Sequence, residues 1–327
     1  MNSLVSVIIP CYNNEEWIAA AIDSALSQTY TPIEVIVIDD GSTDKSLEII
    51  KSYGDRLKWE TGVNRGQSAA RNRGFKLSSG KYIQWLDADD YIFPDKIMHQ
   101  VQYLETVDCD IVYGDWIYQT HDQLKIDEIS LSDINITGKS QDILRDLLEG
   151  LALTVMNCLT KREVVESVNG FDEDLRACED VLFWIKAAIL RVKFGYQPGC
   201  YSVYRRHKND TVSTISIKAL CDSADIAFMK AYELLLKSDM FEKYRKGLAS
   251  LYFTLGKLYL YVDFNSASKC MKKVDFFCPN YKPNRNSVYE KSFIYFGFKI
   301  TSGLFILTNN FKKMYVIVQP RKSKTRH

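Results

Sequence analysis

Three carboxylates, Asp87, Asp89 and Asp90, crowd one short stretch of the sequence and directly follow a strand-like run. That run, residues 81–86, consists mainly of β-forming residues, which is typical of a buried strand. Carboxylates this close together repel one another, and a hard divalent cation such as Mg²⁺ or Mn²⁺ relieves the repulsion and suits a phosphorylated ligand. An isolated D-x-D pattern is equally compatible with a solvated acidic turn, so its chemistry depends on the rest of the chain.

Alternating strands and helices must position this acidic turn. Strand-like runs and helical patterns follow one another in the order 4–9, 17–26, 33–38, 42–53, 57–61, 68–77 and 81–86. The alternation predicts an α/β fold, with a mostly parallel doubly wound sheet and helices on both faces. Such sheets bind ligands beyond the carboxyl ends of their strands. Because Asp40 follows the second strand as Asp89 follows the later one, both are expected at one edge of the sheet.

The pattern changes twice farther along the chain. After a helix at 95–106 and a strand at 109–114 it loosens, and from residue 216 it becomes helical. Further elements are expected in the order 141–149, 161–168, 179–191, 201–204, 219–237, 241–262 and 266–277. We therefore expect residues 1–115 to form a ligand-binding half of one domain, residues 116–215 its second half, and residues 216–327 a helical extension.

Composition places the chain among globular proteins. It has 327 residues, of which 46% are hydrophobic and 25% charged. The net charge of +1 conceals a basic tail, since residues 267–327 carry 13 basic and 2 acidic residues. The eight cysteines form no C-x-x-C pair, and the amino terminus lacks a signal-peptide pattern. These features predict reduced thiols, a cytoplasmic location and no secretion.

Six ordered runs carry a family resemblance. They are VSVIIPCYN at 5–13, SALSQTY at 24–30, VIDDGSTD at 37–44, NRGQSAARN at 64–72, residues 80–90, and GFDE at 170–173 with the Glu179-Asp180 pair. Over about residues 3–210 the chain resembles the inverting, family 2 type of nucleotide-sugar glycosyltransferase. Enzymes of this type have a Rossmann-like GT-A fold and build bacterial polysaccharides and cell-surface glycans. The resemblance therefore implies a nucleotide-sugar donor, UDP- or GDP-linked.

The donor site is expected at the exits of the first strands. The resemblance assigns Asp40 to accept from an N–H of the base, while Pro10 and Tyr12 are placed to frame the base and ribose. Ordinary packing is the alternative for Tyr12. Arg71 can neutralise the diphosphate or pair with Asp40 or Asp87, and a purely structural role is its alternative.

The resemblance also implies a metal and a base. By this resemblance, Asp87 is expected to contact the ribose or to lie in the surroundings of the metal, and Asp89 is expected to coordinate a bound Mn²⁺ or Mg²⁺. Asp180 matches the catalytic base, with Glu179 as substrate-contacting neighbour and alternative base; helix capping is the other interpretation of these two acids. His207 is expected to complete the metal site or to touch the diphosphate, or else to lie in a solvated basic loop.

The end of the chain suggests a membrane surface. Residues 290–327 combine an aromatic, apolar segment too short to span a bilayer with basic flanks, which fits the interface of an anionic membrane. A helix docked on the protein with a basic end is the alternative. Because the sequence contains no RNA-binding signature, no nucleic-acid partner is expected.

Together these observations predict an inverting transfer of one sugar to a hydroxyl of a glycan or lipid-linked glycan. The enzyme is expected to act in the cytoplasm, peripherally at the inner face of the cell membrane. A sugar nucleotidyltransferase on the same kind of sheet, or a catalytically silent sugar-nucleotide or partner-binding module, is the alternative. Dinucleotide oxidoreduction is disfavoured because no G-x-G-x-x-G follows the first strand.

Overall fold

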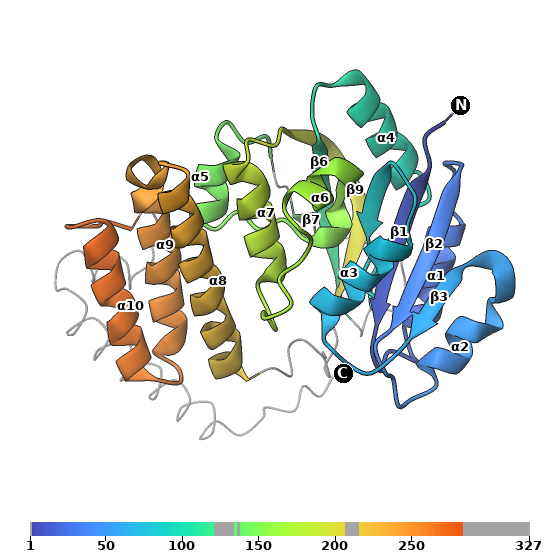
Figure 1. The fold of residues 1–327 in the computed structure, drawn as a ribbon, viewed down its shortest axis with the longest axis horizontal. Helices are drawn as coiled ribbons and strands as arrows, with labels where there is room; N and C mark the ends of the chain where they lie inside the picture. The colour runs from blue at the N-terminus through green and yellow to red at the C-terminus, as the bar shows by residue number, and fades with distance from the viewer. Residues whose placement is uncertain (1, 121–133, 136–137, 207–215, 284–327) are drawn as a thin grey trace, which may run out of the picture. The chain divides into compact units, whose positions relative to one another are not determined.

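The computed structural model describes residues 2–120, 134–135, 138–206 and 216–283 (Figure 1). Its strands are β1 (Val5–Cys11), β2 (Ile33–Asp39), β3 (Lys58–Thr61), β4 (Tyr82–Trp85), β5 (Tyr91–Ile92), β6 (Ile111–Thr120), β7 (Ile134–Asn135), β8 (Cys158–Lys161) and β9 (Phe194–Arg206). Its α-helices are α1 (Ile18–Leu26), α2 (Ser46–Ser52), α3 (Gln67–Leu77), α4 (Lys96–Thr106), α5 (Ile143–Leu148), α6 (Arg162–Ser167), α7 (Glu179–Ile189), α8 (Ile217–Lys237), α9 (Phe241–Tyr259) and α10 (Phe264–Phe277).

One mixed sheet organises the first part of the chain. Its strand order is β3-β2-β1-β4-β8-β6-β9-β5, and β7 pairs with β6. The strands β3, β2, β1 and β4 are mutually parallel, as the alternation of elements predicted, and β6 is parallel to β9. Strand β8 lies antiparallel between β4 and β6 and joins the two parallel sets. The carboxyl ends of β1, β2 and β4 therefore meet at one edge of the sheet.

Helices cover both faces of the parallel strands, which confirms the predicted α/β class. Side chains at alternate positions, such as Val7 and Val37, belong to the core cluster that includes α1 and α4. The intervening positions, such as Ile36, pack with Ala70 of α3. A Cβ atom at Gly74 of α3 would lie 2.4 Å from a methyl carbon of Ile8, so glycine permits this close approach. Burial on both faces explains the continuous apolar runs in the sequence.

Besides the short strands β5 and β7, which were not predicted, and β6, which extends beyond its predicted end at 114, two strands differ from the sequence-based expectation. The predicted strand at 201–204 is the end of the much longer β9, and β8 was not predicted at all. A run of four residues is too short to show a periodic pattern, and its antiparallel pairing with β4 and β6 is a long-range contact. Both strands belong to the half of the sheet in which the sequence pattern loosens.

The chain forms two compact units, Met1–Tyr244 and Arg245–His327. Helix α8, at the start of the predicted helical extension, belongs to the first unit, where it packs against α7. The division into residues 1–115, 116–215 and 216–327 stays a prediction.

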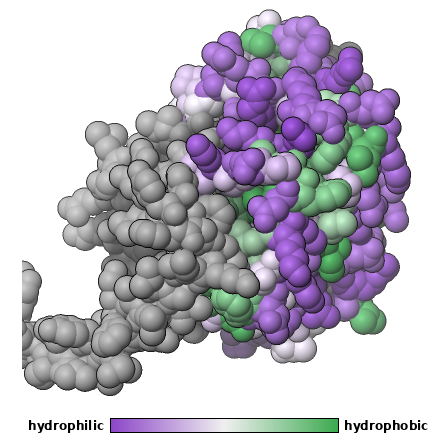
Figure 2. All heavy atoms as spheres, turned by 90° about the vertical axis from the view of Figure 1, so that its left-hand side faces the viewer, coloured by the Kyte–Doolittle hydropathy of each residue, from purple (hydrophilic) through white to green (hydrophobic). Residues whose placement is uncertain are grey.

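In the second unit the end of α9 packs on α10. The rings of Tyr252 and Phe277 lie 5.4 Å apart, and the tight approach of Gly256 to Met271 also joins the two helices. Some apolar side chains are exposed, among them Phe276, and Figure 2 shows hydrophobic patches among hydrophilic side chains on one face of the molecule. No helix within the described ranges is long and apolar enough to cross a membrane. The basic segment 290–327 lies outside the described residues.

Candidate active site

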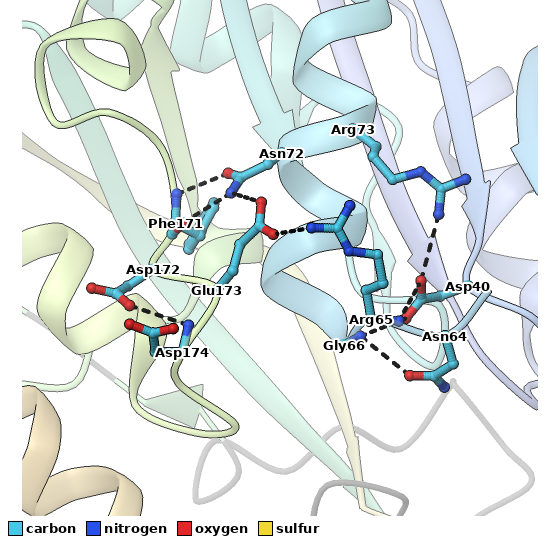
Figure 3. Close-up of polar contacts among 10 residues, drawn as sticks. All are labelled: Asp40, Asn64, Arg65, Gly66, Asn72, Arg73, Phe171, Asp172, Glu173 and Asp174. Atoms are coloured by element: carbon cyan, nitrogen blue, oxygen red, sulfur yellow. Dashed lines mark hydrogen bonds and ion pairs between the residues drawn. The ribbon is translucent and has the colours of Figure 1, made fainter. Parts of the chain in front are cut away.

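Asp40 lies at the amino end of helix α3, next to the parallel strands. Its carboxylate is buried and accepts hydrogen bonds from the backbone N–H groups of Arg65 (3.0 Å) and Gly66 (2.7 Å), as Figure 3 shows. An ion pair of 3.5 Å joins it to Arg73. Gly66 has a φ of 90°, a conformation that favours glycine. Asp40 therefore holds the turn that starts α3, in addition to any contact with a nucleotide base.

Arg71 of α3 joins two distant acidic segments. Its guanidinium lies 2.6 Å from Asp87 and 2.8 Å from Glu179, and only 2% of its side chain is exposed. Gln67, one turn earlier on the same helix face, donates to the same Glu179 oxygen at 2.5 Å. Of the partners predicted for Arg71, the structure has Asp87, whereas Asp40 pairs with Arg73. The acidic turn after β4 and the start of α7 are thus held together.

Asp180 follows Glu179 in the first turn of α7. The side chain is half-buried, and its Oδ1 accepts from the backbone N–H of Val181 at 2.8 Å. Removal from water and the neighbouring Glu179 carboxylate raise the pKa of Asp180 to about 7, although Arg71 acts in the opposite direction. Asp180 is therefore a carboxyl group that changes its charge near neutral pH.

The acidic turn differs in exposure from residue to residue. Asp87 is 30% exposed and Asp89 is half-buried, whereas Asp90 is buried. Burial beside Asp89 and Asp87 raises the pKa of Asp90 well above its usual range. Its Oδ1 accepts from the backbone N–H of Arg205 at 2.9 Å. This contact ties the acidic turn to β9 and was not predicted from the sequence.

Arg205 supports the same turn from β9. Its guanidinium lies over the rings of Trp17 (5.0 Å) and Tyr91 (4.6 Å) and donates to the backbone carbonyl of Asp89 at 3.3 Å. Burial lowers the pKa of Arg205 from its usual value. This arginine is therefore packed against the acidic turn, rather than lying in a solvated basic loop. His207, the predicted metal ligand, lies outside the described residues.

The loops after β1 and β2 are bonded to each other. The N–H of Asn13 donates to Ser42 Oγ at 3.0 Å, and the N–H of Thr43 donates to Asn13 Oδ1 at 2.7 Å. Pro10 is buried in β1, while 41% of Tyr12 is exposed. Of the two residues predicted to frame a base and ribose, Pro10 is therefore buried, whereas the ring of Tyr12 is accessible.

Besides the Asp90–Arg205 contact, three positioning contacts were not predicted. Besides Gln67, Asn72 exchanges two hydrogen bonds of 2.9 Å with the backbone of Phe171, seen in Figure 3. Ser223 of α8 donates to the carbonyl of Ala177 at 2.8 Å and accepts from its N–H at 3.1 Å. Gln67 lies four residues before Arg71, and this helical spacing could have indicated that both side chains face the same partner. Ser223 lies in an ordinary amphipathic helix, and nothing in the sequence around it indicates a contact with Ala177.

The described residues contain no group of three His, Cys, Asp or Glu side chains arranged to hold a metal ion. A cavity of about 640 Å³ lies elsewhere, between α3, residues 165–173 and Lys186. Neither Asp87 nor Glu179, the two carboxylates that pair with Arg71, lines this cavity. This cavity is therefore distinct from the group of acids around Arg71.

Comparison with known proteins gives the same family as the resemblance. The sequence profile of glycosyl transferase family 2 matches residues 6–168. An uncharacterised glycosyltransferase of Rickettsia typhi is 37% identical over 199 residues, covering 59% of this chain and 60% of the relative. The chain thus spans less than two thirds of that relative's length. The uncharacterised glycosyltransferase EpsJ of Bacillus subtilis is 34% identical over 250 residues, which cover 72% of each protein.

Two solved glycosyltransferases share the fold. TarS of S. aureus, in complex with UDP-GlcNAc, superposes with a TM-score of 0.65 at 16% identity, covering 95% of this chain and 91% of TarS. The mannosyltransferase PcManGT of Pyrobaculum calidifontis gives 0.54 at 16% identity, over 97% and 88%. These likenesses confirm the predicted GT-A type of fold. The Bacillus relative, 34% identical and covered over 72% of its length, together with the profile match, establishes that the chain belongs to glycosyl transferase family 2.

Proposed function

We propose that the chain transfers one sugar, with inversion, from a nucleoside-diphosphate sugar to a hydroxyl of a glycan or lipid-linked glycan. The observation that carries the proposal is the bridge from Asp87 through Arg71 to Glu179. It brings an acidic turn suited to a cation and a diphosphate beside Asp180, a carboxyl group able to accept a proton near neutral pH. Family membership supplies the reaction class.

The donor contacts are assigned from the exits of the parallel strands. Tyr12, with its exposed ring, and the backbone of Pro10 would border the base and ribose, and Asp40 would accept from a base N–H. Both oxygens of Asp40 already accept hydrogen bonds from the backbone of residues 65–66 at the start of α3. An N–H of the base would therefore bond to a carboxylate that these contacts already hold in position. Asp87, 30% exposed, is assigned to the ribose.

The acidic turn suits a divalent cation. Its side-chain donors are carboxylate oxygens, which Mg²⁺ and Mn²⁺ prefer, and one or two of them suffice when diphosphate and water complete the coordination. Burial is the main cause of the raised pKa of Asp90, and the negative charges of Asp89 and Asp87, which a cation would compensate, add to it. Asp89 would hold the cation, and His207 stays a proposed further ligand. A bound Mn²⁺ or Mg²⁺ would supply positive charge to the leaving nucleoside diphosphate.

Asp180 is assigned as the general base of a single displacement. Its carboxylate takes the proton of the acceptor hydroxyl while that oxygen forms a bond to the anomeric carbon. The bond from the anomeric carbon to the diphosphate breaks on the opposite face, so the configuration inverts. The base must be ionised, and a pKa of about 7 places that change within the physiological range.

Related proteins suggest which substrates to test first. WfaP of Escherichia coli, named as a UDP-Glc:α-D-GlcNAc-diphosphoundecaprenol β-1,3-glucosyltransferase, is 43% identical over 105 residues, covering 32% of this chain and 42% of WfaP. PcManGT was solved with GDP-Man and Mn²⁺. These names support a UDP- or GDP-linked donor and a lipid-linked acceptor, which agrees with the proposed location at the inner face of the membrane.

The test is a screen of nucleotide sugars in the presence of Mn²⁺. We expect one donor class to raise the melting temperature of the full chain, since ligands that bind the folded state stabilise it. The same donor should be consumed when a polyprenyl-diphosphate-linked sugar is added. Asp180→Asn should keep the thermal stabilisation and lose the transfer. The proposal fails if no nucleotide sugar stabilises the chain and none is consumed.

A further inference from the structure

We propose that Arg71 and Glu179 are positioning residues that lock the base-bearing start of α7 onto the acidic turn after β4. The inference rests on the proposed function and deepens it by separating the roles of neighbouring acids. It changes two expectations drawn from the sequence. Glu179 is neither a base nor a substrate contact, and Arg71 does not bind the diphosphate.

Burial removes Glu179 from the reacting groups. Its side chain is 4% exposed, and one carboxylate oxygen accepts from both Arg71 (2.8 Å) and Gln67 (2.5 Å). Both partners hold the same oxygen, Oε1, inside the protein, so an acceptor hydroxyl has little access to this carboxylate. Asp180, the next residue, is half-buried and bonds within the described residues to its own helix start at Val181.

Arg71 is equally inaccessible to a ligand. Only 2% of its side chain is exposed, its two terminal nitrogens bond to Asp87 and Glu179, and its guanidinium lies 5.1 Å from the ring of Phe171. The side chain has no free surface on which a diphosphate could rest. Its planar fork instead spans two carboxylates from separate segments, which a lysine ammonium cannot do in the same geometry.

The Arg71 bridge fixes the distance between the acidic turn, which carries the proposed metal ligand Asp89, and the proposed base Asp180. Asp87 lies two residues before Asp89, and Glu179 immediately precedes Asp180. A shift of the start of α7 relative to α3 would therefore move Asp180 and break the Arg71–Glu179 pair at the same time. Misplacement of a reacting group by about 1 Å is enough to lower a rate about a hundredfold.

The charged groups around Asp180 affect the pH at which it ionises, so their positions can be tested by measuring that pH. Glu179 and Asp87 raise the pKa of Asp180 and Arg71 lowers it, while the thiols Cys158 and Cys178 lie near enough to interact with the same carboxylate. Neutralising Glu179 should lower the pH at which Asp180 ionises, by about one unit. A substitution that disturbs the packing of α7 but leaves the charge of Glu179 in place would not lower this pH in the same way.

The experiment compares Glu179→Gln, Asp180→Asn and Arg71→Lys in the full chain, using UDP and GDP with Mn²⁺ as binding probes and transfer from the donor found by the screen. We expect all three to bind the nucleoside diphosphate within about threefold of the unmodified protein. Transfer should be abolished in Asp180→Asn and fall about ten- to a hundredfold in the other two. The acidic limb of the Glu179→Gln rate profile should move to lower pH.

Two results would overturn the proposal. If Glu179→Gln abolishes transfer at every pH, as Asp180→Asn should, Glu179 is itself a base. If Arg71→Lys weakens nucleoside-diphosphate binding more than tenfold while the rate at saturating donor stays the same, Arg71 binds the donor.

An unfolding measurement separates this proposal from the proposed function. Glu179→Gln should destabilise the unmodified chain but stabilise an Arg71→Met variant, because in that variant it removes a buried carboxylate that has lost its cation. This change of sign is expected whether or not the chain transfers a sugar. Equal effects in both backgrounds would contradict the pairing, whereas absence of transfer alone would contradict only the proposed function.

Discussion

Replacing Asp180 by asparagine should stabilise the folded protein, and increasingly so as the pH rises. The pKa of Asp180 is raised from 3.8 to about 7 in the folded state, chiefly because burial and Glu179 disfavour its charge. The folded state therefore holds a proton that the unfolded chain has released between about pH 4 and pH 7, so this group lowers stability as the pH rises through that window. Asparagine cannot ionise, and its oxygen can still accept from Val181.

The size of the effect follows from the shift. A difference of about three pH units corresponds to about 4 kcal/mol at most. Because Asp180 is half-buried and titrates beside Glu179, solvent and coupling reduce this value, and we expect about 2 kcal/mol at pH 8. At pH 4 the two proteins should be about equally stable.

Urea unfolding of both proteins at intervals from pH 4 to pH 8 tests the prediction. Asp55→Asn, which removes one carboxylate from an exposed position outside the site, serves as the matched control and should change the stability by less than about 0.5 kcal/mol. If Asp180→Asn is less stable than the unmodified protein at pH 8, or if the difference does not change with pH, the reasoning about the environment of Asp180 is wrong.

Three further outcomes are expected. Asp89→Asn should lose Mn²⁺-dependent transfer while its melting temperature without metal changes by less than a few degrees; undiminished turnover would remove Asp89 from the proposed metal site. Burial of Glu34 is outweighed by hydrogen bonds from Lys58 and Ser6, which lower its pKa to about 2, so the group adds stability above pH 4.5 that is lost as the pH falls towards 2. Glu34→Gln should accordingly cost roughly 1–2 kcal/mol at pH 7 and little at pH 2, as urea unfolding at the two pH values would show. Deleting residues 290–327 should abolish co-sedimentation with anionic liposomes, and unchanged co-sedimentation would contradict membrane association.

The first strands and helices were predictable because their signals are local. The continuous apolar runs of β1 and β2 require cover on both faces, and the helical spacing between them requires a crossover, so the parallel order follows from the pattern alone. The same reasoning placed Asp40 and Asp89 after strands that end at one edge. The family was also evident from the ordered motifs, because each motif is a contiguous run.

What the sequence left open was the choice of partners among several acids at that edge. Arg71 and Arg73 are two residues apart, which places them on opposite sides of α3 at 3.6 residues per turn. The docking of α3 on β1 and β2 then turns Arg71 towards Asp87 and Glu179, and Arg73 towards Asp40. Helical spacing specifies that the two arginines diverge, but it does not specify which acid each one meets.

The sequence by itself therefore determined the α/β architecture, the family and the set of residues able to do chemistry. The tertiary structure decided which of those residues remain accessible. Glu179 and Asp180 are adjacent acids with the same local context, yet one is buried in an ion pair and the other is half-exposed. The physical reason is that burial and pairing depend on contacts between segments far apart in the chain, and these exist once α3 and α7 have packed.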